Sequence, residues 1–199
     1  MPRLRRLRRP ELPVDCATLA RWLIGKILVH EAADGVTSGR IVETEAYVVG
    51  DAAGHAFIGQ TARNRSLFLQ RGHAYVYFIY GMHTCVNVSA ETPGVGAGSL
   101  IRALEPRDGI ALMQARRGTQ RVTDLARGPG RLTEAMGITL ADDGRNLTRP
   151  GPLWLATDRS EPGAVGTSVR IGISREAHRP LRFYERGNPN VSGTLKLRT

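Results

Sequence analysis

Two glutamates and a tyrosine occupy alternate positions of the segment Arg40-Ile41-Val42-Glu43-Thr44-Glu45-Ala46-Tyr47, which predicts a β-strand over 40–48. Because strand side chains alternate between faces, Glu43, Glu45 and Tyr47 share one face. Burying such a face is costly unless it lines a polar site, so the alternative is a solvent-facing strand. Two carboxylates suit hydrolysis of a sugar bond. Their Cα separation of about 7 Å does not choose between mechanisms, and the strand pattern leaves the two glutamates equivalent.

A second motif is aromatic: Ala74-Tyr75-Val76-Tyr77-Phe78-Ile79-Tyr80-Gly81-Met82. It predicts a strand over 74–79 and a chain reversal over 80–82, with Tyr75 and Phe78 in the core. Tyr80 adjoins the glycine at the expected hairpin tip, where there is little core to enter. A ring held there suits insertion into a base stack, as minor-groove binding proteins insert side chains between base steps.

Two further polar residues lie in apolar strands. Arg102, within Ser99–Leu104, needs a partner if it is buried, and Glu43 or Glu45 is the candidate. Asn87 also needs hydrogen-bond partners. A structural ion pair and a structural amide are the alternatives.

Anion-binding candidates follow later in the chain. The sequence Arg127-Gly128-Pro129-Gly130-Arg131 precedes a predicted helix, and the free amides of a helix start bind anions. Arg63 and Arg65 form a second basic candidate for phosphate contact. An ordinary capped loop is the alternative for the glycine-containing segment.

The composition supports a polyanionic partner. Lys and Arg total 28 against 18 acidic residues, which gives a net charge of +10 in a chain of 199 residues. Such a basic domain is typical of nucleic-acid binding, with a membrane surface and the ribosome as rivals. No apolar run is long enough to span a bilayer. Cys16 and Cys85 form no zinc pattern, the histidines are scattered, and we expect neither a metal nor a cofactor.

The elements that must position these residues alternate between strands and short helices. Asp15 predicts the N-cap of a helix over 17–24 that ends at Gly25. Further helices are expected over 108–116, beginning near Pro106, and over 129–136. The remaining expected strands cover 26–29, 84–89, 99–104, 168–173 and 181–184, and the expected turns or loops cover 32–39, 51–73, 93–98 and 140–166.

This order predicts an α+β fold: a single compact domain with a curved, largely antiparallel β-sheet, flanking helices and a protruding hairpin. The strand–helix repeats and glycine fingerprint of a Rossmann fold are missing. Residues 1–12, which begin with an arginine-rich stretch, are expected to form a basic, flexible arm, and residues 13–199 the domain. The two thiols and the lack of a secretory signal indicate a cytoplasmic, DNA-associated protein.

Taken together, the motifs resemble the alkyladenine (3-methyladenine, or methylpurine) DNA glycosylase family. The resemblance covers roughly residues 14–192 in order. It rests on the segments Glu43-Thr44-Glu45-Ala46-Tyr47, Arg63-Asn64-Arg65, Tyr75–Met82, Leu100–Pro106 and Arg179–Tyr184.

This resemblance implies a monomeric enzyme of base excision repair that flips damaged purines out of duplex DNA and hydrolyses their glycosidic bond. It implies that Glu45 is the general base and that Arg102 holds Glu45 and the water. The base pocket would comprise Tyr47, His55, Tyr77 and Asn87. Tyr80 would intercalate into the base stack of the DNA. The DNA backbone would be bound by Arg63, Arg65, Met82, Gly128, Gly130 and Arg131.

Lysine scarcity limits the chemistry further. Lys26 and Lys196 are the only lysines, and neither lies in the candidate site. A glycosylase that also nicks the backbone needs an amine for a Schiff base, so we expect a monofunctional enzyme that leaves an abasic site. A processed Pro2 amine, a non-catalytic nucleic-acid-binding module with the same hairpin, and a formyltransferase-like enzyme are the alternatives.

Overall fold

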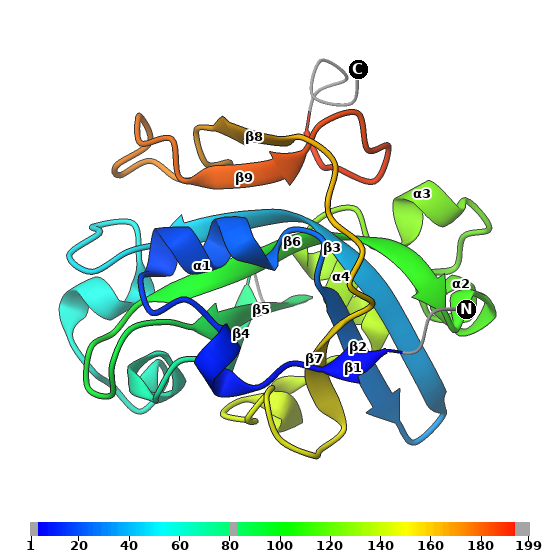
Figure 1. The fold of residues 1–199 in the computed structure, drawn as a ribbon, viewed down its shortest axis with the longest axis horizontal. Coiled ribbons are helices and arrows are strands. Elements are labelled where there is room, and N and C mark those ends of the chain that lie inside the picture. The colour runs from blue at the N-terminus through cyan, green and yellow to red at the C-terminus, as the bar shows by residue number, and fades with distance from the viewer. Residues whose placement is uncertain (1–3, 80–82, 194–199) are drawn as a thin grey trace.

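A computed structural model describes residues 4–79 and 83–193. In this part of the chain, antiparallel strands form one curled sheet in the order β1-β7-β2-β3-β6-β5-β4, and β9 extends it by pairing with β3 and β8 (Figure 1). The predicted α+β class and its curved antiparallel sheet are confirmed. The strands are β1 (Arg5–Arg6), β2 (Ile27–Ala32), β3 (Gly35–Tyr47), β4 (Ala74–Ile79), β5 (His83–Ser89), β6 (Gly98–Asp108), β7 (Leu153–Thr157), β8 (Val165–Ser168) and β9 (Arg182–Glu185).

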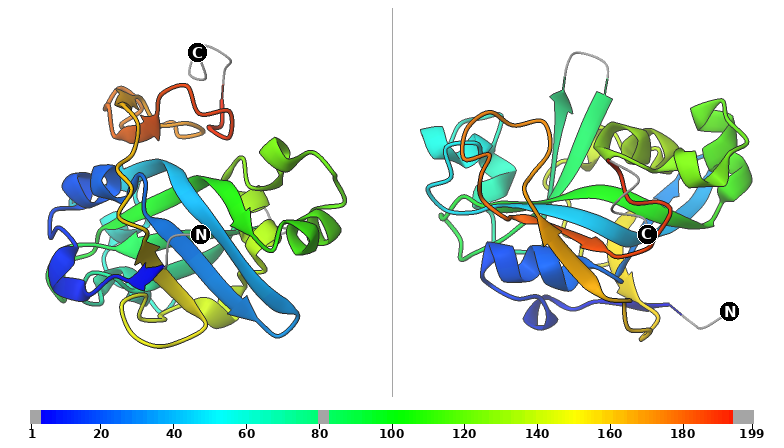
Figure 2. Two further views of the ribbon diagram at one scale, coloured as in Figure 1. Left: turned by 45° about the vertical axis from the view of Figure 1, so that its right-hand side comes forward. Right: turned by 90° about the horizontal axis from the view of Figure 1, so that it is seen from above.

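Helices cover both sides of the long strands β3 and β6. In the right-hand view of Figure 2, α1 lies on one side of them, and the β4–β5 hairpin and α4 lie on the other. The helices are α1 (Cys16–Leu23), α2 (Ile110–Arg117), α3 (Val122–Leu125) and α4 (Pro129–Met136). Short 3-10 helices are η1 (Arg9–Glu11), η2 (His55–Ile58), η3 (Arg65–Phe68) and η4 (Leu140–Asp142). No helix of the described residues is long and apolar enough to cross a membrane.

Helix α1 forms as its sequence predicts. The Asp15 side chain accepts a hydrogen bond of 2.7 Å from the Thr18 amide and caps the first turn. The helix ends before Gly25, whose φ of +84° suits glycine. On its inner face, Leu19 and Leu23 are fully buried. Thr44 of β3 donates to a carbonyl of α1, which ties the helix to the strand that carries both glutamates.

The prediction of a flexible arm over residues 1–12 is wrong for residues 4–12. Strand β1 pairs with β7, and the side chains of Leu7 and Leu12 are buried in the core. The arm therefore covers a sheet edge and gains apolar burial that the arginine-rich sequence does not suggest. Met1 to Arg3 lie outside the described residues.

Several element boundaries also differ from the predictions. The chain turns at 33–34, so β3 begins at Gly35 and extends the β2–β3 ladder through most of the expected turn. Strand β6 passes through Pro106, where the register with β3 shifts, and the helix begins at Ile110. The expected loop 140–166 contains β7, whose residues pair with β1 and β2.

The expected strand 168–173 was wrong in a way that matters for the site. Strand β8 ends at Ser168 because its pairing with β9 ends there, opposite Arg182. The segment 169–173 leaves the ladder, and its backbone is free to bind elsewhere.

Candidate functional site

Arg102 is aimed by a β-bulge between β3 and β6. Glu43 pairs with Ala103 and Thr44 pairs with Ile101, so the register passes over Arg102. A bulge leaves one residue without a cross-strand partner and redirects its side chain. Its guanidinium reaches both glutamates of β3, which confirms the predicted pairing of this arginine with Glu43 or Glu45.

Glu45 is completely buried and is held by three donors. The backbone amide of Ile171 donates to Oε1 at 2.7 Å. The Tyr47 hydroxyl donates to Oε2 at 3.0 Å, and Nη1 of Arg102 lies 3.1 Å from the same oxygen. A carboxylate oxygen can accept two hydrogen bonds, so Oε1 keeps acceptor capacity for one more donor, such as a water molecule.

Glu43 is equally buried but has different partners. Its Oε1 accepts from Nε of Arg102 at 2.9 Å and from Nε of Arg182 at 2.7 Å. Ser192 donates to both oxygens, through its amide at 2.7 Å and its hydroxyl at 2.9 Å. Burial raises the pKa of Glu43, but the guanidiniums of Arg102 and Arg182 outweigh it, so this pKa lies below its usual value. Glu43 thus accepts four hydrogen bonds, whereas Glu45 accepts two and has one further contact with a guanidinium nitrogen.

An inner cavity of about 200 Å³ is lined by the residues that contact Glu45, whereas the buried Glu45 is itself not part of the lining. The two side chains that bind Oε2 of Glu45, Tyr47 and Arg102, line this cavity, and so does Ile171. The other residues expected in a base pocket, His55, Tyr77 and Asn87, line it as well. Asn87 donates to the Tyr75 carbonyl at 3.3 Å, which fixes the orientation of its amide.

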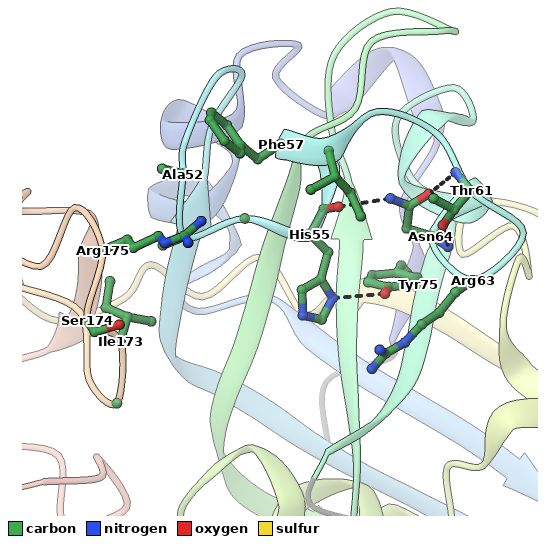
Figure 3. A pocket seen from close by; sticks show the side chains of 14 residues that line it. Ala52, His55, Phe57, Thr61, Arg63, Asn64, Tyr75, Ile173, Ser174 and Arg175 are labelled. Atoms are coloured by element: carbon green, nitrogen blue, oxygen red, sulfur yellow. Dashed lines mark hydrogen bonds between the residues drawn. The ribbon is translucent and has the colours of Figure 1, made fainter.

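Three aromatic rings form one wall of the inner cavity. The Tyr75 and Tyr77 rings stack with centroids 5.1 Å apart, and the His55 ring meets Tyr77 edge-on at 4.5 Å. Tyr75 is in the core as predicted, but its hydroxyl also binds Nδ1 of His55 at 2.9 Å (Figure 3). Desolvation and the Arg63 guanidinium lower the pKa of His55, so the ring is neutral at pH 7. Phe78, the other predicted core aromatic, is instead half exposed.

An outer cavity of about 400 Å³ adjoins the inner one, and His55, Gly172 and Ile173 line both. Figure 3 shows Arg63 on one side of it and Arg175 on the other, with His55 between them. Arg63 also donates to the Phe78 carbonyl at 3.2 Å, which ties the loop to β4. The mouth of the site is therefore positively charged on two sides.

The glycine-containing start of α4 lies against the hairpin. A Cβ at Gly130 would stand 3.0 Å from Cβ of His83, so this position allows the helix and β5 to approach closely. Gly128 precedes the helix with a φ of +123°. Pro129, between them, lines the inner cavity, and Arg131 is exposed.

The remaining expected DNA contacts are less defined. Arg65 is exposed at the start of η3. Tyr80 and Met82 lie outside the described residues. Among the residues that are described, no group of three or more histidine, cysteine, aspartate or glutamate side chains is arranged to hold a metal ion.

Sequence reasoning missed a buried ion pair beside the site. The Arg170 side chain has no exposed surface and binds the carboxylate of Asp51. The sequence predicts a strand at Arg170, and no spacing in the sequence connects this residue to Asp51. Arg182 belongs to one of the segments that carry the family resemblance, but its role as a partner of Glu43 is shown by their hydrogen bond in the structure.

A family model and individual relatives both indicate the same protein family. The family model for methylpurine-DNA glycosylase matches residues 11–189. A protein of Mesorhizobium japonicum is 61% identical over 189 residues, which is 95% of this chain and 91% of that protein. A protein of Paraburkholderia phytofirmans is 51% identical over 191 residues, 96% of this chain and 90% of its own. Each of the two bears the name "Putative 3-methyladenine DNA glycosylase".

Proposed function

The chain belongs to the methylpurine-DNA glycosylase family, and from this premise we propose that it excises alkylated or deaminated purines, such as 3-methyladenine, from duplex DNA. It acts as a monofunctional hydrolase of base excision repair and leaves an abasic site. The observation that carries this proposal is Glu45, a buried carboxylate whose three donors all line an aromatic cavity.

The damaged nucleotide must leave the base stack before its C1′ can reach Glu45. Tyr80, which follows β4 in the sequence, fills the gap and offsets part of the cost of unstacking, which is a few kcal/mol. Arg63 and Arg65, with Met82 and the α4 start at Gly128, Gly130 and Arg131, bind the DNA backbone. The charge at the mouth of the outer cavity supports this arrangement.

The extruded base enters the inner cavity. Tyr47 and Tyr77 stack on it, and their π faces attract the positive charge of an alkylated purine. The neutral His55 offers a hydrogen bond to the base edge. Asn87, held by the Tyr75 carbonyl, stands against the exocyclic amine of guanine and disfavours that base.

Bond cleavage then builds positive charge on the sugar, which the Glu45 carboxylate stabilises. A water molecule on the free acceptor position of Oε1 attacks C1′ and transfers its proton to Glu45. The N-glycosidic electron pair leaves with the base, so a cationic alkylpurine departs as a neutral purine. Arg102 fixes Oε2 and prevents Glu45 from turning away.

The decisive test is incubation with duplexes that carry hypoxanthine, 1,N6-ethenoadenine or 3-methyladenine. We expect release of the free base without strand scission. The Glu45→Gln variant should bind these duplexes and lose excision by about 10²–10⁴-fold, the usual contribution of a general base. Exposed Glu31, on β2, is the matched control, and Glu31→Gln should excise normally. Binding without release by the wild-type protein would instead indicate a non-catalytic binding module.

A further inference from the structure

Next to the proposed base pocket, Arg170 connects the loop that contains it to the loop that contains Asp51. Its Nη1 donates to the Ala46 carbonyl at 2.9 Å, and both terminal nitrogens bind the carboxylate of Asp51. Its Cζ lies 4.7 Å from the centroid of the Tyr47 ring. Tyr47 and Asp51, which both contact this guanidinium, line the inner cavity, whereas Arg170 itself does not.

The backbone of the same segment reaches Glu45. Ile171, the next residue, donates its amide to Oε1 of Glu45 at 2.7 Å and lines the inner cavity together with Gly172 and Ile173. Because the Arg170 side chain is fixed at Asp51 and Ala46, the backbone that follows it is fixed as well. The Arg170 side chain thus fixes the position of the cavity wall at 171–173 and of the Ile171 amide that donates to Glu45.

Stability alone does not explain this arrangement. Replacing a buried ion pair with uncharged groups is often neutral or stabilising. In addition, Nε of Arg170 is buried and has no hydrogen-bond partner among the described residues, which costs free energy. The presence of this arginine beside the proposed catalytic carboxylate, despite these energetic costs, indicates a role in the reaction.

We propose that Arg170 is a positioning residue for base excision: it holds the Tyr47 ring as a wall of the base pocket and holds Ile171 so that its amide orients Glu45. This inference rests on the proposed function and adds to it a residue that does not touch the base. Asp51 acts with Arg170 as the anchor on the other loop.

The test separates positioning from folding. The double variant Arg170→Met/Asp51→Asn removes both charges together and leaves no single buried charge, and the asparagine can still accept the hydrogen bond from the Ala53 amide. Single-turnover excision of 1,N6-ethenoadenine from duplex DNA gives a rate constant, an amplitude that reports the folded active fraction, and a Kd for the duplex. The rate constant is independent of how much protein is folded.

We expect the rate constant of the double variant to fall about 10- to 100-fold, because small misplacements of catalytic groups have effects of that order. Its amplitude and its Kd should stay within about threefold of the wild type. Arg170→Lys, which keeps a cation near Tyr47, should recover part of the rate. Arg179→Gln is the control, because Arg179 follows in the same loop and pairs with Glu176 at the surface.

A double variant that excises with the wild-type rate constant would overturn the inference. So would a loss confined to the amplitude or to the Kd, because either result would assign Arg170 to folding or to DNA binding. An inactive wild-type protein would remove the proposed function, and this inference with it. An active wild type with an unaffected double variant would remove only the inference.

Discussion

Glu43 and Glu45 differ in their partners, and this predicts opposite consequences for the same substitution. In Glu43→Gln, the buried Arg102 keeps Glu45 as its carboxylate partner, but Arg182 loses its carboxylate contact among the described residues. Breaking a buried pair in this way costs about 3–5 kcal/mol. In Glu45→Gln, Arg102 keeps Glu43, so the cost is that of poorer hydrogen bonding, about 1–3 kcal/mol.

Thermal and urea unfolding measure the difference. For a chain of this size, about 1 kcal/mol shifts Tm by roughly 2–4 °C, so Glu43→Gln should lower Tm by about 6–20 °C. Glu31→Gln, the exposed control, should stay within about 0.5 kcal/mol of the wild type. The folded fraction of Glu43→Gln should retain far more excision activity than Glu45→Gln.

The pH dependence has a definite sign. The folded-state pKa of Glu43 lies below its usual value of 4.5, so its ionised form contributes stability above that pH and the contribution is lost as the pH falls through the folded pKa. The gap in unfolding free energy between wild type and Glu43→Gln should therefore be largest near neutral pH and narrow below about pH 4.5. A loss under about 1 kcal/mol at pH 7, or a larger loss in Glu45→Gln, would refute the assignment of the two glutamates.

Three further predictions concern DNA. Arg63→Gln should reduce the slope of log K, the duplex-binding constant, against log salt concentration by about 0.9. Arg21→Gln on α1 should change this slope less. Equal slopes for the two variants would remove Arg63 from the backbone contacts. Asn87→Ala should raise excision of guanine relative to hypoxanthine by about tenfold in competition assays, the equivalent of one hydrogen bond, and an unchanged ratio would argue against its selectivity role. Borohydride should trap no covalent DNA complex, since Lys26 packs on Trp22 away from both cavities; a trapped complex would show that an amine takes part.

Local patterns in the sequence predicted much of the fold. The N-cap Asp15 marked α1, and the segment starting at Pro129 marked α4 with its observed bounds. The aromatic run predicted β4 because consecutive aromatic and β-branched residues favour strands. Strand β7 was missed, although Leu153 and Leu155 alternate with the partly exposed Trp154 in the expected period of two.

The segment 165–173 shows where local patterns stop. Its apolar and β-branched residues favour a strand, but the strand ends at Ser168 because its partner β9 begins at Arg182, opposite that residue. Beyond that point the chain follows contacts with distant residues: Arg170 with Asp51, and the Ile171 amide with Glu45. No sequence period encodes contacts between residues more than a hundred positions apart.

The sequence by itself determined that Glu43, Glu45 and Tyr47 lie on one strand face, because side-chain alternation is a property of the strand alone. It also determined the basic charge and the scarcity of lysine. The tertiary structure decided which donors each glutamate receives. The bulge at Arg102, the pairing of β9 with β3 and the path of the 169–173 segment give Glu43 two arginine partners and Glu45 a backbone amide, with an acceptor position left on Oε1 of Glu45. Two equivalent carboxylates become different because hydrogen bonding depends on what surrounds them in space.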